Sequence, residues 1–155
     1  MDAPGRYPMN DPYRLQRFVD AQLQTFDRAC EELRDGVKRS HWMWFIFPQI
    51  NGLGRSATAQ TYAISSRDEA QAYLAHPILG ERLRVATRIV NEVAGRPIEQ
   101  IFGFPDHLKF HSSMTLFAEV SDESVFQRAL AQYFFARRDP VTLQQLDFLK
   151  RARDE

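Results

Sequence analysis

Two segments of the sequence combine aromatic rings with side chains that can carry charge or donate hydrogen bonds. Residues 38–49 read KRSHWMWFIFPQ, and residues 106–115 read DHLKFHSSMT. A tryptophan can stack on a flat ligand, while lysine, imidazole, amide and hydroxyl groups can hold its polar end. The sequence therefore predicts a pocket where these segments pack together. Its candidate ligand-binding residues are Lys38, Ser40, His41, Trp42, Trp44, Gln49, Lys109, Ser113 and Thr115.

The aromatic segment also has a purely structural interpretation. Trp42, Trp44, Phe45 and Phe47 would each bury a large apolar area and could nucleate the packing of the surrounding helices. Residue types alone leave both interpretations open: a pure core, or a core in which some of these residues line a cavity.

The residue types do not identify a reaction. His41 is the best candidate for a general acid or base, because imidazole titrates near neutral pH. A nucleophilic triad is not predicted. The sequence has no GxSxG motif, Cys30 lies in an apolar helical pattern, and adjacency of Ser40 and His41 does not give the required geometry. The catalytic residues are therefore unknown.

Two histidines have a spacing that is typical of metal sites. His107 and His111 are four residues apart, so on a helix they would share one face and supply half of a zinc site. The sequence has no HExxH motif, and a third ligand would have to come from a distant residue such as His41 or His76. We therefore predict no metal and no cofactor.

A loop that contains two glycines, residues 51–56, precedes an expected helix start. Helix N-termini favour anions, but the loop lacks the lysine of a P-loop. A tight turn is the favoured interpretation.

Apolar spacing and capping residues predict an all-α fold. Ser66 and Glu69 form a capping-box pattern that opens a helix over residues 67–75, and Ser40 could cap a short helix that starts at His41. One long first helix is expected to end at Gly36, with an apolar face made by Leu15, Phe18, Val19, Leu23, Phe26, Cys30 and Leu33. We expect a single compact domain of about six to eight short helices over residues 13–150, after a flexible N-terminal arm, residues 1–12.

The composition indicates one domain of a cytoplasmic protein. The chain has 155 residues, with 20 Lys+Arg against 20 Asp+Glu, 44% hydrophobic residues and one cysteine. Zero net charge provides no general attraction for nucleic acid or an anionic membrane, and a single cysteine suits a reducing compartment. Residues 1–12 lack a secretion signal, and the longest apolar run, residues 42–47, is far shorter than the ~18 residues that span a bilayer.

The sequence resembles the bacterial domain of unknown function 1810 family, some members of which carry the label calpastatin. The match runs from about residue 15 to residue 146. It rests on residues 36–49, 52–54, 56, 73–77, 79–80, 101–103, 106, 108–109, 112–117, 139–140 and 142–143. The resemblance implies a mainly helical single domain but no activity. The composition of a packed domain does not fit calpastatin, which is a long disordered inhibitor.

Together these patterns favour a helical protein that binds a small polar or anionic ligand, such as a nucleotide-like molecule. Trp42 or Trp44 would stack on it, and Lys38 and Lys109 would supply positive charge. One alternative is an enzyme of unknown reaction that uses His41. The other is a structural module that self-associates without catalysis, through aromatic residues 133–135, which cannot all face one core.

Overall fold

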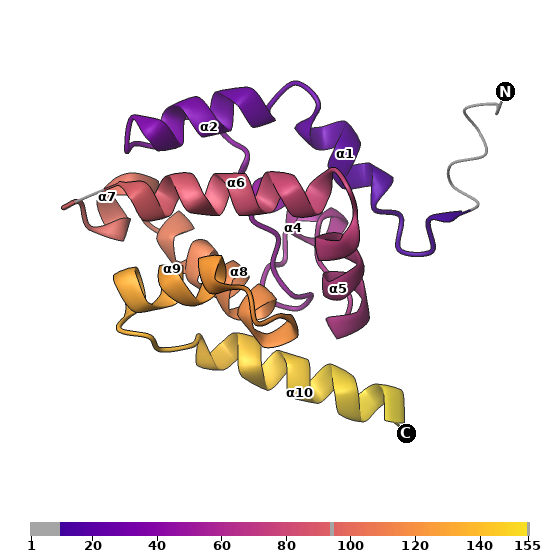
Figure 1. Cartoon of the computed structure of the whole chain (residues 1–155). Coiled ribbons are helices and arrows are strands. Elements are labelled where there is room, and N and C mark those ends of the chain that lie inside the picture. The colour runs from indigo at the N-terminus through magenta and orange to yellow at the C-terminus, as the bar shows by residue number, and fades with distance from the viewer. Residues whose placement is uncertain (1–9, 94, 155) are drawn as a thin grey trace, which may run out of the picture.

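The computed structural model describes residues 10–93 and 95–154, and this part of the chain is all-α, as predicted (Figure 1). It contains ten helices, more than the six to eight expected, because several short ones lie between the longer ones. Their bounds are α1 Gln16–Gln22, α2 Phe26–Arg34, α3 Met43–Ile46, α4 Ala57–Thr61, α5 Arg67–Ala75, α6 Leu79–Glu92, α7 Ile98–Phe102, α8 Asp106–Val120, α9 Ser124–Phe134 and α10 Pro140–Asp154.

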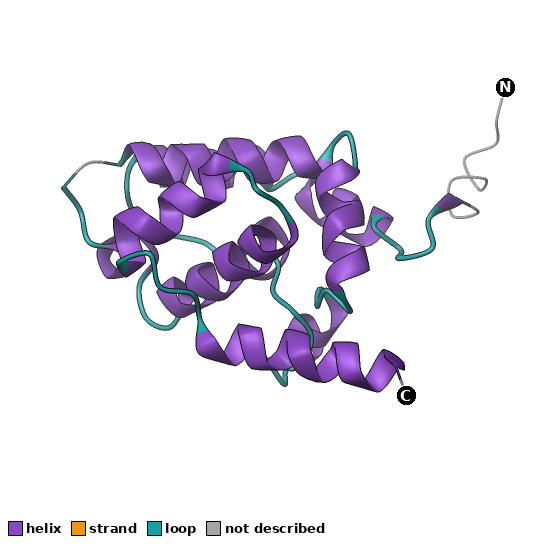
Figure 2. Ribbon diagram, turned by 60° about the horizontal axis from the view of Figure 1, so that its bottom comes forward, coloured by secondary structure: helices purple, strands orange, loops and turns teal. Residues whose placement is uncertain are grey.

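Two long helices organise the packing. The α6 helix packs against α2, α5 and α9, and α8 packs against α5, α7, α9 and α10. Figure 2 shows the helices joined by loops, with α10 along one edge of the molecule. Residues 112–118 of α8 are all buried, so this helix has no solvent face there, and its polar residues Ser112, Ser113 and Thr115 are buried together with the apolar ones. Its first turn, with Asp106 and Lys109, reaches the surface.

The core next to α8 is built from aromatic rings of distant segments. The ring of Phe47 lies 5.0 Å from that of Phe110 and 5.8 Å from that of Phe102, and Trp42 lies 6.2 Å from Phe47. Trp42, Phe47 and Phe110 are at most 1% exposed. The aromatic segment is therefore partly core, and this core holds it against α8, as the pocket hypothesis required.

The predicted first helix is wrong, because the chain breaks it in two at residues 23–25. The α1 helix packs on α3 while α2 packs on α6, so no single straight helix could serve both contacts. The Gln22 amide is buried at the break, where it donates to the carbonyl oxygen of Phe45 (2.7 Å) and to the hydroxyl of Tyr73 (3.1 Å). Leu23, expected on the apolar face, is 70% exposed.

Local capping signals were more reliable than the long pattern. Ser66 accepts a hydrogen bond from the backbone N–H of Glu69, and α5 spans the predicted residues 67–75. The predicted cap at Ser40 is wrong: α3 begins only at Met43, because the Ser40 hydroxyl donates to Glu32. Most of the predicted arm, residues 1–9, lies outside the described residues. Asp11 accepts hydrogen bonds from the backbone N–H groups of Leu15 and Gln16.

Gly80 of α6 makes a close approach that only glycine allows. A Cβ atom there would lie 2.1 Å from the carbonyl oxygen of Leu74, at the end of α5. Backbone atoms cannot move aside as a side chain can, so we expect Gly80→Ala to lower the free energy of unfolding by about 1–3 kcal/mol, despite the better helix propensity of alanine. Thermal unfolding of this variant and of Arg88→Ala, an exposed position on the same helix, measures the effect. Equal stability would contradict the close contact.

Candidate functional site

The segment between α2 and α3 is fixed by one buried carboxylate. Glu32 of α2 is 5% exposed and accepts hydrogen bonds from the backbone N–H groups of Arg39 (2.7 Å) and Ser40 (3.1 Å). It also accepts from the Ser40 hydroxyl and from the indole Nε1 of Trp42 (2.9 Å). Four donors on one carboxylate therefore set the path of residues 39–42 and the orientation of the Trp42 ring.

These donors decide the charge state of Glu32. Desolvation raises the pKa of its carboxyl, but the hydrogen bonds from Ser40, Arg39 and Trp42 together outweigh that effect and lower the pKa from 4.5 to about 2. Glu32 is thus an anion at neutral pH, and its negative charge lies within the protein beside the candidate site.

A cluster of three charged side chains joins the two predicted segments. The Asp106 carboxylate, in the first turn of α8, lies 2.8 Å from the Lys38 ammonium and 2.9 Å from the Lys109 ammonium. The three side chains are largely buried, with 9%, 18% and 22% exposure for Lys38, Asp106 and Lys109. Burial raises the pKa of Asp106, but the two ammonium groups more than offset it, so this pKa lies below its ordinary value. The cluster carries a net charge of one positive unit.

Each lysine of this cluster also lies over a tryptophan. The Lys38 ammonium is 5.1 Å from the centre of the Trp42 ring, and the Lys109 ammonium is 4.6 Å from that of Trp44. Such contacts stabilise a cation by the negative face of the indole. Lysine occurs at only three positions of the sequence, 38, 109 and 150, among 20 Lys and Arg residues. Two of the three are therefore in this cluster.

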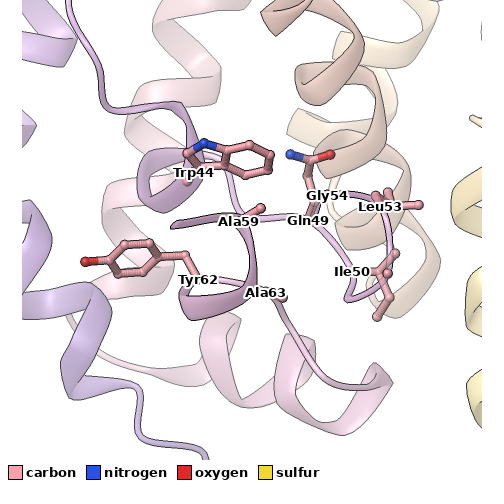
Figure 3. Close-up of a pocket in the computed structure, with 9 residues that line it drawn as sticks. Trp44, Gln49, Ile50, Leu53, Gly54, Ala59, Tyr62 and Ala63 are labelled. Carbon is pink, nitrogen blue, oxygen red and sulfur yellow. The ribbon is translucent and has the colours of Figure 1, made fainter. Parts of the chain in front are cut away.

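A small cavity lies next to Trp44 (Figure 3). Its lining also includes Gln49, Leu53, Ala59 of α4 and Tyr62. The space open to a water-sized sphere is about 10 Å³, which is room for about one water molecule. The cavity wall is held by a parallel bridge between residues 50 and 64, in which the backbone N–H of residue 64 donates to the carbonyl oxygen of Gln49 at 2.8 Å.

The amide nitrogen of Gln49 has no hydrogen-bond acceptor among the described residues. Gln49 is 6% exposed, and its Nε2 is fully buried without a hydrogen-bond acceptor among the described residues. Figure 3 shows the amide nitrogen on the side of the amide that faces Trp44. The large majority of buried side-chain polar atoms in proteins are hydrogen-bonded, so an unpaired amide that lines a cavity is the feature of this site that most needs an explanation.

Two glycines bring the loop of residues 51–55 against its neighbours. A Cβ atom at Gly54 would lie 2.6 Å from the Ala59 Cβ and 3.0 Å from the Trp44 ring. Gly52 has a φ of 101°, and a Cβ atom there would lie 2.3 Å from the amide nitrogen of Gln145 in α10. The loop is thus a tight turn, as favoured from the sequence, and Ser56 caps α4 through the backbone N–H of Ala59.

The other predicted site residues do not line this cavity. His41 is exposed, and its ring makes no hydrogen bond to the part of the chain that the structure describes. Ser113 is fully buried, and its hydroxyl is unpaired among the described residues. The Thr115 hydroxyl accepts the backbone N–H of Asp139 at 2.9 Å, which joins α8 to the start of α10. The Ser40 hydroxyl and the Trp42 indole N–H both donate hydrogen bonds to Glu32.

The spaced histidines have separate partners. His107 lies 3.3 Å from the carbonyl oxygen of Gly103 through its Nδ1. His111 stacks on Phe134, with ring centres 3.9 Å apart, and its Nε2 lies 2.8 Å from the carbonyl oxygen of Arg137. Across residues 10–93 and 95–154, no three His, Cys, Asp or Glu side chains are grouped so that they could hold a metal ion.

Sequence reasoning missed Glu32 and Asp106 as site residues. Glu32 directly precedes Leu33, which lies on the apolar face of the helix. An acidic residue next to this apolar face was the available signal in the sequence. Asp106 lies three residues before Lys109, a helical spacing at which opposite charges pair.

The fold and the site together define a small all-α domain in which a lysine and aspartate cluster adjoins an aromatic-walled cavity. The chain belongs to the family described as "Protein of unknown function (DUF1810)", whose model matches residues 12–146. Comparison with curated proteins gave no match. Among solved structures, the chain is similar to the conserved hypothetical protein Rv1873 from Mycobacterium tuberculosis, with 53% sequence identity and a TM-score of 0.87. The match covers 88% of this chain and 99% of that protein. No helix in the described residues is long and apolar enough to cross a membrane.

We expect Glu32→Gln to lower the free energy of unfolding at pH 7 by about 1–3 kcal/mol. The NH2 group of the glutamine would replace a carboxylate oxygen, and it cannot accept hydrogen bonds from the donors that surround it. Because the folded pKa of Glu32 is about 2, below its ordinary value of 4.5, its stabilisation is present above about pH 4.5 and is lost as the pH falls towards 2. The wild-type stability should therefore fall more steeply than that of the variant over this range. Denaturant unfolding at several pH values measures both slopes.

The matched control is Glu31→Gln, which removes an exposed carboxylate of the same helix. This variant should keep the wild-type stability at pH 7 and the wild-type pH slope. Parallel slopes for Glu32→Gln and wild type would show that the carboxylate of Glu32 does not hold the loop as described.

Proposed function

We propose that this chain binds a small ligand with a polar or anionic group, which the Gln49 amide and the Lys38 and Lys109 ammonium groups recognise. The single observation that supports this most is the buried Gln49 amide, which has no acceptor among the described residues. Leaving a buried donor unpaired costs about 1–3 kcal/mol. A ligand that supplies an acceptor atom to Nε2 would remove this cost.

Trp44 connects the cavity to the charged cluster. Its ring lines the cavity that contains Gln49, and the Lys109 ammonium lies 4.6 Å from the centre of the same ring. A ligand that enters the cavity would therefore contact the Gln49 amide and the Trp44 ring, and the Lys109 ammonium lies close to that ring. The lysine cluster has one more positive than negative charge, although the whole chain has net charge zero. The two ammonium groups can each pair with an anionic group of a ligand.

The size of the cavity sets a condition on binding. About 10 Å³ accepts one water-sized group, so a larger ligand enters only when the cavity widens. Leu53 is the large apolar side chain of the glycine loop at the cavity wall, and it is only partly buried.

The proposal assigns no reaction. His41 is exposed and no described side chain orients its ring, so we give it no role as acid or base.

Self-association remains a second prediction with less support. The Tyr133 hydroxyl donates to the carbonyl oxygen of Val90 at 2.6 Å, and Phe134 stacks on His111, so only Phe135 of this aromatic run is strongly exposed, at 86%.

A substitution of Gln49 separates a binding role from a structural one. Leucine has a similar size and no polar atoms, so we expect Gln49→Leu to raise the free energy of unfolding of the ligand-free protein by about 1 kcal/mol, or about 2–4 °C in Tm. The same variant should lose the rise in Tm that the ligand gives the wild type. Inorganic phosphate, ATP and NAD⁺ are the probes, and Lys109→Ala should weaken the response to an anionic one.

The control for the stability measurement is Gln144→Leu, an exposed glutamine of α10, which should leave the Tm within about 1 °C. If Gln49→Leu instead lowers the free energy of unfolding, the amide has a structural partner in solution, and the observation behind the proposal is removed.

A further inference from the structure

A second concave site lies between α5 and α10, where the first turn of α5 and the C-terminal half of α10 are side by side (Figure 1). The groove has a volume of about 430 Å³, within the range of small-molecule sites. It shares no lining residue with the cavity at Gln49. From α10 its lining comprises Leu146, Leu149, Lys150 and Arg153, and from the α5 side Ser65, Ser66, Arg67, Asp68 and Gln71.

The floor of the groove is apolar and belongs to α10. Leu146 is 2% exposed and is part of the core, and Leu149 is partly buried against that core. Leu149 follows Leu146 by three residues, so both side chains lie on the same face of the helix. An apolar chain or ring that lay on this face would cover the area of Leu149 that is still exposed to water.

The rim of the groove has an excess of positive charge. Lys150 is exposed and makes no ion pair with a described side chain. Arg67 lies 3.4 Å from Glu119, but Arg138 contacts the same carboxylate at 2.8 Å, so one anion serves two cations. The negative charge of Asp68 is matched by Arg153, at 3.2 Å. In a chain with no net charge, this excess is local to the groove.

We propose that this groove binds a small amphiphilic anion: a carboxylate with an apolar chain, which lies on Leu146 and Leu149 with its head group between Lys150 and Arg67. The apolar floor takes the chain, and the rim, with more positive than negative charge, takes the head group. Neither part suffices alone, because an exposed cation binds a simple anion weakly and an apolar floor without a charge partner has no preference for a carboxylate. This site is independent of the one proposed at Gln49.

The three lysines make a direct test practical. Lysine labelled with ¹³C at Cε should give three side-chain NMR signals, from Lys38, Lys109 and Lys150. Sodium octanoate, titrated below its micelle concentration, should shift the Lys150 signal to saturation and leave the other two unchanged. Acetate has the head group without the chain, and octanol has the chain without the charge. Each should bind at least about tenfold more weakly than octanoate.

Two variants keep the Lys150 reporter and test the rest of the groove. Leu149→Gln should weaken octanoate binding about tenfold, because the floor loses its apolar surface. Arg151→Gln, an exposed neighbour outside the groove, should leave the binding unchanged. Circular dichroism confirms that each variant is folded. A Lys150 shift that does not saturate, or is the same for acetate, would overturn the proposal, as would equal binding by the two variants. A shift of Lys38 or Lys109 alone would place the anion in the other site.

Discussion

The candidate site depends on the hydrogen bonds that the Glu32 carboxylate accepts. This carboxylate is buried in α2 and gathers four donors from residues 39–42, among them the indole of Trp42. This fixes Trp42 in the core, and Lys38, whose backbone N–H donates to the carbonyl oxygen of Ile101 at 2.7 Å, lies over its ring. A buried anion with fewer donors would be costly, so all four contacts must form together. The same hydrogen bonds therefore order residues 39–42 and keep Glu32 ionised.

The second constraint is the position of α8 at the centre of the fold. The ring of Phe110 in α8 packs on that of Phe47, and the first turn of α8 brings Asp106 to Lys38 and Lys109 to Trp44. Packing thus determines which charges meet at the surface. The three side chains are largely buried, so the cost of desolvation offsets much of their attraction and the ion pairs add modest stability. Their larger consequence is that the two ammonium groups are held against the rings of Trp42 and Trp44, and the Trp44 ring also lines the cavity.

How much the sequence reveals depends on how local each interaction is. The cap at Ser66 involves a residue three positions away, and α5 has the predicted bounds. The break after Gln22 depends on Phe45 and Tyr73, which are remote in sequence, so periodicity could not predict it. The same holds for the site. Lysine and tryptophan types indicated Lys109 and Trp44, but the unpaired amide of Gln49 is a property of three-dimensional packing that no spacing encodes.

The proposed function requires that the Gln49 amide nitrogen has no acceptor until a ligand binds. A crystal structure of the ligand-free protein, at a resolution that defines ordered water, tests it most directly, because it shows what lies within hydrogen-bond distance of Nε2. We expect no protein acceptor there and no ordered water that is also bonded to a second protein group. A well-ordered water that joins Nε2 to another protein atom would contradict the proposed function, because the amide would then be a satisfied part of the core.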